Sequence, residues 1–67
     1  MIMLYERIKA LCDAKGYSIR ELEFLADISY GSIGHWRTSV PRIDNVIAVA
    51  DVLEVSVDYL IGGTVND

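Results

Sequence analysis

Few side chains in this sequence could do covalent chemistry. The chain has one cysteine, Cys12, and one histidine, His35, and no third group is placed to make them a nucleophile and its base. No set of cysteine, histidine or carboxylate residues has the spacing of a zinc site. Cys12 lies on an apolar helical stripe, which favours a core position over a reactive thiol. We therefore expect a protein that is not an enzyme and needs no metal, cofactor or small-molecule ligand.

Polar groups suited to binding gather near the middle of the chain. Tyr30, Ser32 and His35 carry hydroxyl and imidazole groups that donate and accept hydrogen bonds. Basic residues occur on both sides of them, at Lys15, Arg20, Arg37 and Arg42. This local composition permits contact with a phosphate backbone.

The overall charge opposes such contact. The net charge is −4 and the isoelectric point is about 4.7, whereas phosphate neutralisation by Lys and Arg supplies most non-specific affinity for nucleic acid. The charge is unevenly distributed, however. After Arg42 the chain has no basic residue and five acids, at Asp44, Asp51, Glu54, Asp58 and Asp67. This asymmetry allows an acidic protein to have one functional side.

The length of 67 residues predicts one small domain over residues 1–67. Its apolar fraction of 52% supports a packed core and argues against disorder. A single cysteine cannot form an internal disulfide, and the sequence has no leader-like segment and no run of about 18 apolar residues. We expect a soluble, cytoplasmic protein that does not enter a membrane.

Apolar periodicity and cap signals predict five short helices and no strand. Leu4, Ile8 and Cys12 share one stripe of the first helix, which Gly16 ends in the left-handed conformation. Ser56 caps the last helix, in which Leu60 points inward. The predicted helices span residues 3–15, 19–26, 30–38, 43–53 and 57–61, and a frayed tail follows at 64–67.

Residues 18–37 form the centre of this arrangement, as two short helices joined by a tight turn. Ser18 and Glu21 have the spacing of a capping box, which predicts the start of the second helix. Asp27 tolerates the left-handed conformation that a tight turn requires. Ser29 is the predicted cap of the third helix. These signals together predict a helix-turn-helix.

The third helix has an inward face and an outward one. Ile33 and Trp36 lie three residues apart, so they face the core together, and Ile28 fills the turn. Gly31 and Gly34 each cost about 1 kcal/mol inside a helix, which indicates a close approach by a neighbouring helix or by a partner. The other faces are left with Tyr30, Gly31, Ser32, His35 and Arg37.

From Leu4 to Gly62 the sequence resembles the lambda-repressor-like, or Cro/Xre-type, DNA-binding domains, particularly small regulators of phages and low-GC Gram-positive bacteria. The segments that carry the resemblance are YERIKALCDAKGYSIREL, ISYGSIGHW and PRIDNVIAVADVLEVSVDYLIGG. The resemblance implies a compact all-α fold of five helices, with a helix-turn-helix formed by the second and third. It also implies a sequence-specific transcriptional regulator that binds double-stranded DNA, typically a repressor of a phage or mobile element.

In this family the third helix enters the major groove. The resemblance therefore implies base contacts at Tyr30, Gly31, Ser32 and His35. It implies phosphate contacts at Ser18, Ile19, Arg20, Arg37, Thr38 and Arg42, of which Arg37 and Arg42 are favoured. A solvated helix face is the alternative for Tyr30 and His35, and an ion pair with Glu23 is the alternative for Arg20.

The sequence departs from the family pattern at several positions. Many members carry Gln where Ile19 stands, and Ile19 can offer a phosphate only its backbone N–H. Glu23 replaces a small residue that packs against the third helix, and Asp27 replaces the usual Gly of the turn. The loop before Pro41 is one residue shorter than in most relatives. These departures affect the DNA contacts more than the fold.

Two kinds of protein partner are also implied. The family often forms dimers through the last helix, which makes this protein a candidate homodimer with an apolar interface at Val55, Val57, Tyr59, Ile61 and Val65. The acidic surface favours a different function, in which the same scaffold binds another protein, as an antirepressor or antitoxin-like partner, and does not bind DNA. Binding to mixed duplex DNA at rising salt distinguishes these functions.

Overall fold

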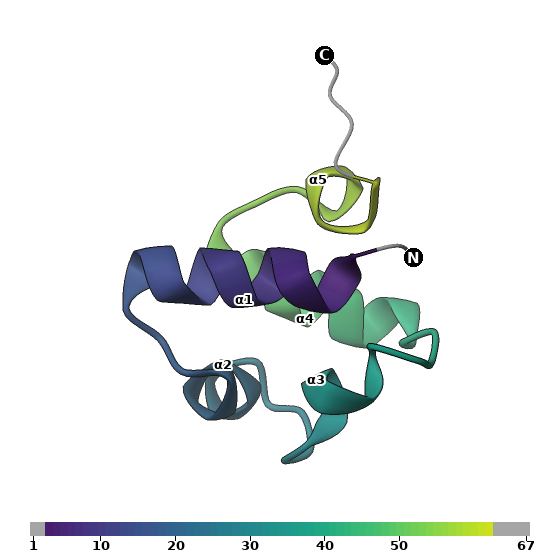
Figure 1. Cartoon of the computed structure of the whole chain (residues 1–67), viewed down its shortest axis with the longest axis horizontal. Helices are drawn as coiled ribbons and strands as arrows, with labels where there is room; N and C mark the ends of the chain where they lie inside the picture. Colours follow the sequence, from purple (N-terminus) through teal and green to yellow (C-terminus); the bar gives the residue numbers. More distant parts are fainter. Residues whose placement is uncertain (1–2, 63–67) are drawn as a thin grey trace.

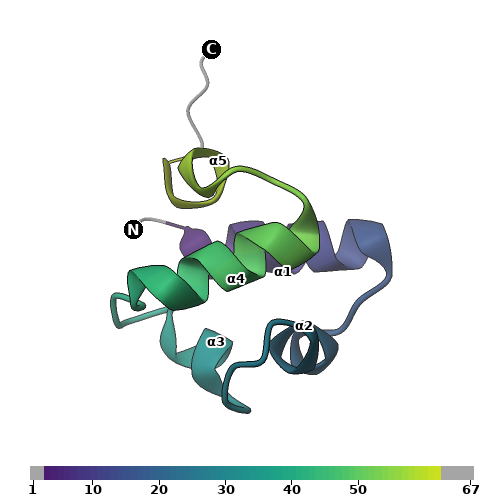
Figure 2. The same cartoon turned by 180° about the vertical axis from the view of Figure 1, so that it is seen from behind.

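A computed structural model describes residues 3–62 as an all-α domain. Its helices are α1 (Leu4–Lys15), α2 (Ile19–Leu25), α3 (Ser32–His35), α4 (Ile43–Leu53) and α5 (Val57–Gly62). α1 and α4 lie side by side and run in the same direction (Figure 1). Seen from either side, α2 and α3 lie on one side of this pair and α5 lies on the other (Figure 2). The predicted five-helix fold is confirmed.

The core lies where the helices meet. Each helix contributes at least one fully buried apolar side chain, so the whole arrangement depends on mutual packing. The largest fully buried residues are Leu4, Ile8, Leu22, Ile33, Leu53 and Leu60. Cys12 belongs to the same cluster, and its burial raises the pKa of the thiol, so the group stays protonated and unreactive at neutral pH. The predicted core position of Cys12 is confirmed.

Local signals define most helix ends as the sequence indicates. Gly16 follows α1 with φ of +82°, in the left-handed conformation that glycine adopts without strain. Ser56 Oγ accepts the N–H of Tyr59 at 3.0 Å, which caps the start of α5. The predicted frayed tail at 64–67 lies outside the described residues.

The third helix is shorter than the sequence predicts. It spans one turn, Ser32–His35, instead of residues 30–38. The predicted cap at Ser29 is wrong. Gly31 is the residue that directly precedes the helix, and glycine has no side chain that could cap it. Gly31 has φ of +88°, so glycine is required there for its conformation and not for space within the helix. After α3 the chain continues as turns, in which the N–H groups of Thr38 and Ser39 bind the carbonyl of His35.

Candidate nucleic-acid interface

The helix-turn-helix presents α3 because its inner side is tightly packed. Leu22 of α2 and Ile33 of α3 are fully buried, and Trp36 keeps only 7% of its surface exposed. Ile28 is half-buried in the turn and packs against the same core. Asp27 has φ of +60°, as the turn was predicted to require. The predicted inward orientation of Ile33 and Trp36 is confirmed.

The residues predicted to contact bases lie together on the outer side of this corner. Tyr30 is 77% exposed and His35 is also exposed. Gly31 and Ser32 lie between them and are half-buried. The Tyr30 and His35 side chains are therefore accessible to a large ligand that approaches α3 from outside, whereas Ser32 is partly covered.

Gly34 also lies on this accessible side. A methyl group added at Gly34 would meet no atom within 4 Å, so no neighbouring helix requires glycine at this position. The alternative that Gly34 makes room for a neighbouring helix is therefore wrong. The space beside the Gly34 backbone is open on this side of α3.

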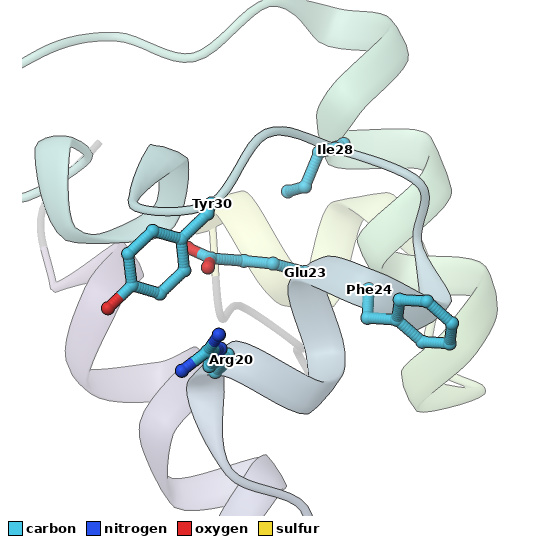
Figure 3. A pocket seen from close by; sticks show the side chains of 5 residues that line it. All are labelled: Arg20, Glu23, Phe24, Ile28 and Tyr30. Atoms are coloured by element: carbon cyan, nitrogen blue, oxygen red, sulfur yellow. The ribbon is translucent and has the colours of Figure 1, made fainter.

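Glu23 belongs to this corner of the molecule, although its sequence pattern does not predict a role for it there. It is 3% exposed, and it is the only charged side chain classed as buried within residues 3–62. Oε1 accepts the N–H of Gly31 at 3.0 Å and Oε2 accepts the N–H of Ile33 at 3.0 Å. Figure 3 shows the side chain extending from α2 toward the chain at Tyr30. A carboxylate thus caps the first turn of α3, where the amide groups have no acceptor within the helix.

This contact explains one departure from the family pattern. A small residue would pack against α3 at this position, whereas Glu23 reaches across the turn and binds its amide groups. The acceptor lies eight and ten residues before its two donors, so no local spacing rule identifies it. The only signal in the sequence is an acidic residue on an apolar helix face, and this signal does not indicate which amide groups the carboxylate binds.

Arg20 is the cation that lies beside Tyr30, one of the residues predicted to contact bases. Its guanidinium carbon lies 4.8 Å from the centre of the Tyr30 ring, within the range of a cation–π contact. The predicted alternative of an ion pair between Arg20 and Glu23 is wrong, because no Arg20 nitrogen lies within ion-pair distance of the Glu23 carboxylate, which binds backbone amides. Arg20, Glu23 and Tyr30 line a hollow of about 240 Å³ with Phe24 and Ile28 (Figure 3).

The other side chains predicted to bind phosphates contact groups that lie away from Tyr30. The guanidinium of Arg37 lies 4.3 Å from the centre of the Tyr5 ring, so it is directed toward α1. Arg42 is exposed and its Nε lies 3.3 Å from Asp44 Oδ1. Thr38 is exposed, with its hydroxyl 3.5 Å from the carbonyl oxygen of His35. The structure therefore places Arg20 beside Tyr30, whereas Arg37 lies against Tyr5 of α1 and Arg42 lies beside Asp44.

The start of α2 is capped locally. Ser18 Oγ accepts the N–H of Glu21 at 3.0 Å, and Glu21 Oε1 accepts the N–H of Ser18 at 2.9 Å. The predicted capping box is confirmed. Ser18 therefore uses both its hydroxyl and its amide within the box, while Ile19 and Arg20 follow as the first residues of the helix, whose N–H groups have no intrahelical acceptor.

The basic side chains fall into two groups, those that pair with a carboxylate and those that lie over an aromatic ring. Within residues 3–62 the salt bridges join Lys9 to Asp13, Lys15 to Glu54 and Arg42 to Asp44. Arg7, Arg20 and Arg37 have no carboxylate partner among these residues, and each lies over a tyrosine ring instead. Stacking on a ring does not remove the positive charge of a guanidinium, so Arg20 and Arg37, which lie within and directly after the helix-turn-helix, keep a charge that a phosphate can bind.

The predicted dimer interface offers less apolar surface than the sequence indicates. Val55, Val57 and Ile61 pack in part against the core. Tyr59 is 45% exposed, and the guanidinium of Arg7 lies 6.0 Å from its ring centre. Val65 lies outside the described residues.

Other kinds of site have no support in the described part of the chain. No three His, Cys, Asp or Glu side chains of residues 3–62 lie close enough to hold a metal ion. None of the helices described there is long and apolar enough to cross a membrane.

Comparison with known proteins identifies α2, the turn and α3 as part of a known helix-turn-helix family. Residues 8–60 match a family model described as helix-turn-helix. The match extends from the middle of α1 to α5, so it includes the whole of α2, the turn and α3. Neither the curated proteins nor the solved structures contain a match to this chain.

Proposed function

This chain belongs to the Cro/C1-type helix-turn-helix family of DNA-binding regulators, and on that premise we propose that it is a transcriptional repressor that reads the DNA major groove with α3. The observation that carries the proposal is the outer ridge of the helix-turn-helix, which is formed by Tyr30, Gly31, Ser32 and His35. Tyr30 and His35 are exposed on this ridge, while Ile33 and Trp36 on the opposite face are buried in the core.

Each side chain of the ridge has a chemical role available to it. Tyr30 can pack against a thymine methyl group or donate its hydroxyl, and Ser32 can donate or accept a hydrogen bond. His35 can donate to the N7 atom of guanine. None of them forms the two-point contacts that Arg makes with guanine or Asn with adenine, so direct contacts supply modest specificity.

Phosphate contacts position the helix on the duplex. Arg20 and Arg37 are supported by their lack of a carboxylate partner within residues 3–62. Arg20 has additional support because it lies beside Tyr30. Ile19 contributes its backbone N–H, and the polar groups that complete the proposed set are Ser18, Thr38 and Arg42.

A domain with so few cations binds one half-site weakly. Two copies related by a two-fold axis would add their half-site energies and read a palindrome. We place the contact between copies at α5, where Tyr59 supplies exposed aromatic surface beside Val55, Val57 and Ile61. Val65 completes the proposed interface. Such a regulator would act in the cytoplasm, on the DNA of a phage or another mobile element.

Selection of bound duplexes from a random pool tests this proposal. A preferred sequence with two half-sites is the expected result, and affinity should fall as salt rises, with a slope of about −0.9 per phosphate contact in a log–log plot. Arg20→Ala and Arg37→Ala should each reduce that slope by about 1, whereas His35→Ala should change the preference at one base pair.

Lys9→Ala is the matched control, because it removes a cation that Asp13 already neutralises. It should leave the salt dependence unchanged. Absence of any complex with duplex DNA at low salt would contradict the proposal and would favour the alternative of a protein-binding module, which the net charge of −4 supports.

A further inference from the structure

We propose that Glu23 is a positioning residue for DNA recognition, because its carboxylate sets the backbone from which the reading side chains project. The proposal rests on the proposed function of α3. It concerns a residue that lies in α2 and is buried, so Glu23 itself would not touch a base.

The geometry ties Glu23 to the reading residues directly. Its two oxygens accept the N–H groups of Gly31 and Ile33, which are the residues on either side of Ser32. Tyr30 precedes Gly31 in the chain, and Gly31 has a left-handed conformation that turns the chain into α3. The carboxylate therefore holds the backbone at the point where Tyr30 and Ser32 project.

α3 needs such a contact because it is too short to hold itself. It has four residues, and a single helical turn is unstable alone, since helix nucleation restricts several residues in return for one hydrogen bond. The burial of Ile33 and Trp36 fixes the inner side of this turn. The capping carboxylate fixes its start, which is the part nearest to Tyr30 and Ser32.

A second contact from α2 acts on the same place. Arg20 precedes Glu23 by three residues, so both side chains leave α2 on the same side. Arg20 stacks on the Tyr30 ring while Glu23 binds the backbone that follows Tyr30. Figure 3 shows both side chains directed toward Tyr30, whereas Phe24 points away from it. α2 thus orients the side chain and the backbone of the same segment.

Hydrogen bonds to base edges are sensitive to small displacements, since they weaken steeply when the distance or angle departs from its optimum. Phosphate contacts from long, flexible cations tolerate such shifts better and carry no sequence information. Loss of the Glu23 contact should therefore reduce discrimination between DNA sequences more than it reduces general affinity for DNA.

Glu23→Gln tests this inference, with Glu21→Gln as the matched control. Both variants remove one negative charge from α2, but Glu21 caps its own helix and does not contact α3. The measured quantity is the ratio of affinities for a duplex selected by the wild-type protein and for a mixed-sequence duplex. We expect Glu23→Gln to lower this ratio by about tenfold or more, which is the size of one lost base contact, and Glu21→Gln to leave it within about twofold.

The free protein supplies a second measurement that does not depend on DNA. The amide proton resonances of Gly31 and Ile33 should move in Glu23→Gln and remain in place in Glu21→Gln, because only Glu23 accepts those two N–H groups. If Glu23→Gln does not fold, Glu23→Asp replaces it. That variant keeps the charge but is too short to reach both amides, so the affinity ratio should fall as well.

The outcomes separate the two proposals. If the wild-type protein prefers its selected duplex and Glu23→Gln has the same affinity ratio, the positioning role is overturned and the proposed function stays intact. Unmoved amide resonances of Gly31 and Ile33 would overturn the contact itself. A wild-type protein that binds no duplex would overturn the proposed function, and with it the positioning role.

Discussion

The starts of the two helices of the helix-turn-helix are capped by side chains in different ways. At the start of α2 the cap is local, since Ser18 and Glu21 lie three residues apart and bind each other's backbone amides. At the start of α3 the cap comes from Glu23 across the turn, eight and ten residues before the amides that it binds. The first cap is exposed to solvent and the second is buried.

This difference separates the roles of the two helices. A local capping box forms whenever α2 forms and competes with water for its hydrogen bonds, so its contribution is small and independent of the rest of the domain. The buried cap exists only when α2 and α3 are packed together, and it is shielded from water. The conformation of α3 is therefore coupled to the folding of the whole domain, which suits a helix that has to present side chains in a fixed orientation.

Glu23→Ala is the strongest test of the comparison. It removes the acceptor for two amide groups that are largely shielded from water, and we expect the free energy of unfolding to fall by about 2–3 kcal/mol. Urea denaturation followed by circular dichroism measures the change. A loss of less than about 1 kcal/mol would mean that water replaces the carboxylate and that the buried cap is no stronger than the exposed one.

Ser18→Ala tests the other side of the comparison. It removes the local cap of α2, and we expect a loss of about 1 kcal/mol in the same denaturation experiment. Because Ser18 does not contact α3, the preference among DNA sequences should stay as in the wild-type protein even if general affinity falls. A changed sequence preference would show that the two helix starts are not independent.

Gly34→Ala sharpens the comparison at the outer side of α3. Since an added methyl group meets open space, the free protein should become more stable by about 0.5–1 kcal/mol, through the better helix propensity of alanine. Affinity for duplex DNA should fall, because the methyl group keeps the backbone of α3 from its closest approach. Denaturation and a DNA titration measure the two effects.

Ala10→Gly provides the reverse control, because Ala10 is exposed within α1, away from the helix-turn-helix. It should lower stability by about 1 kcal/mol and leave DNA affinity unchanged. If Gly34→Ala raised stability without any loss of DNA affinity, close approach of DNA at Gly34 would be contradicted.

Much of the fold is predictable from neighbours in the chain. The capping box at Ser18, the left-handed conformations of Gly16 and Asp27, and the inward face that Ile33 and Trp36 share each depend on residues within about four positions. The third helix is shorter than its local pattern indicates, because the left-handed Gly31 and the Glu23 carboxylate set its start and turns replace it after His35.

The amino-acid sequence by itself therefore determined the family, the five-helix fold and the polar residues that lie on the third helix and just before it. Tertiary structure alone decided which groups the charged side chains bind: Glu23 the start of α3, Arg20 the Tyr30 ring and Arg37 the Tyr5 ring. The physical reason is that a backbone conformation or a short-range cap is specified by adjacent residues. A long charged side chain instead takes the partner that helix packing brings within its reach, and that partner has no fixed separation in the chain.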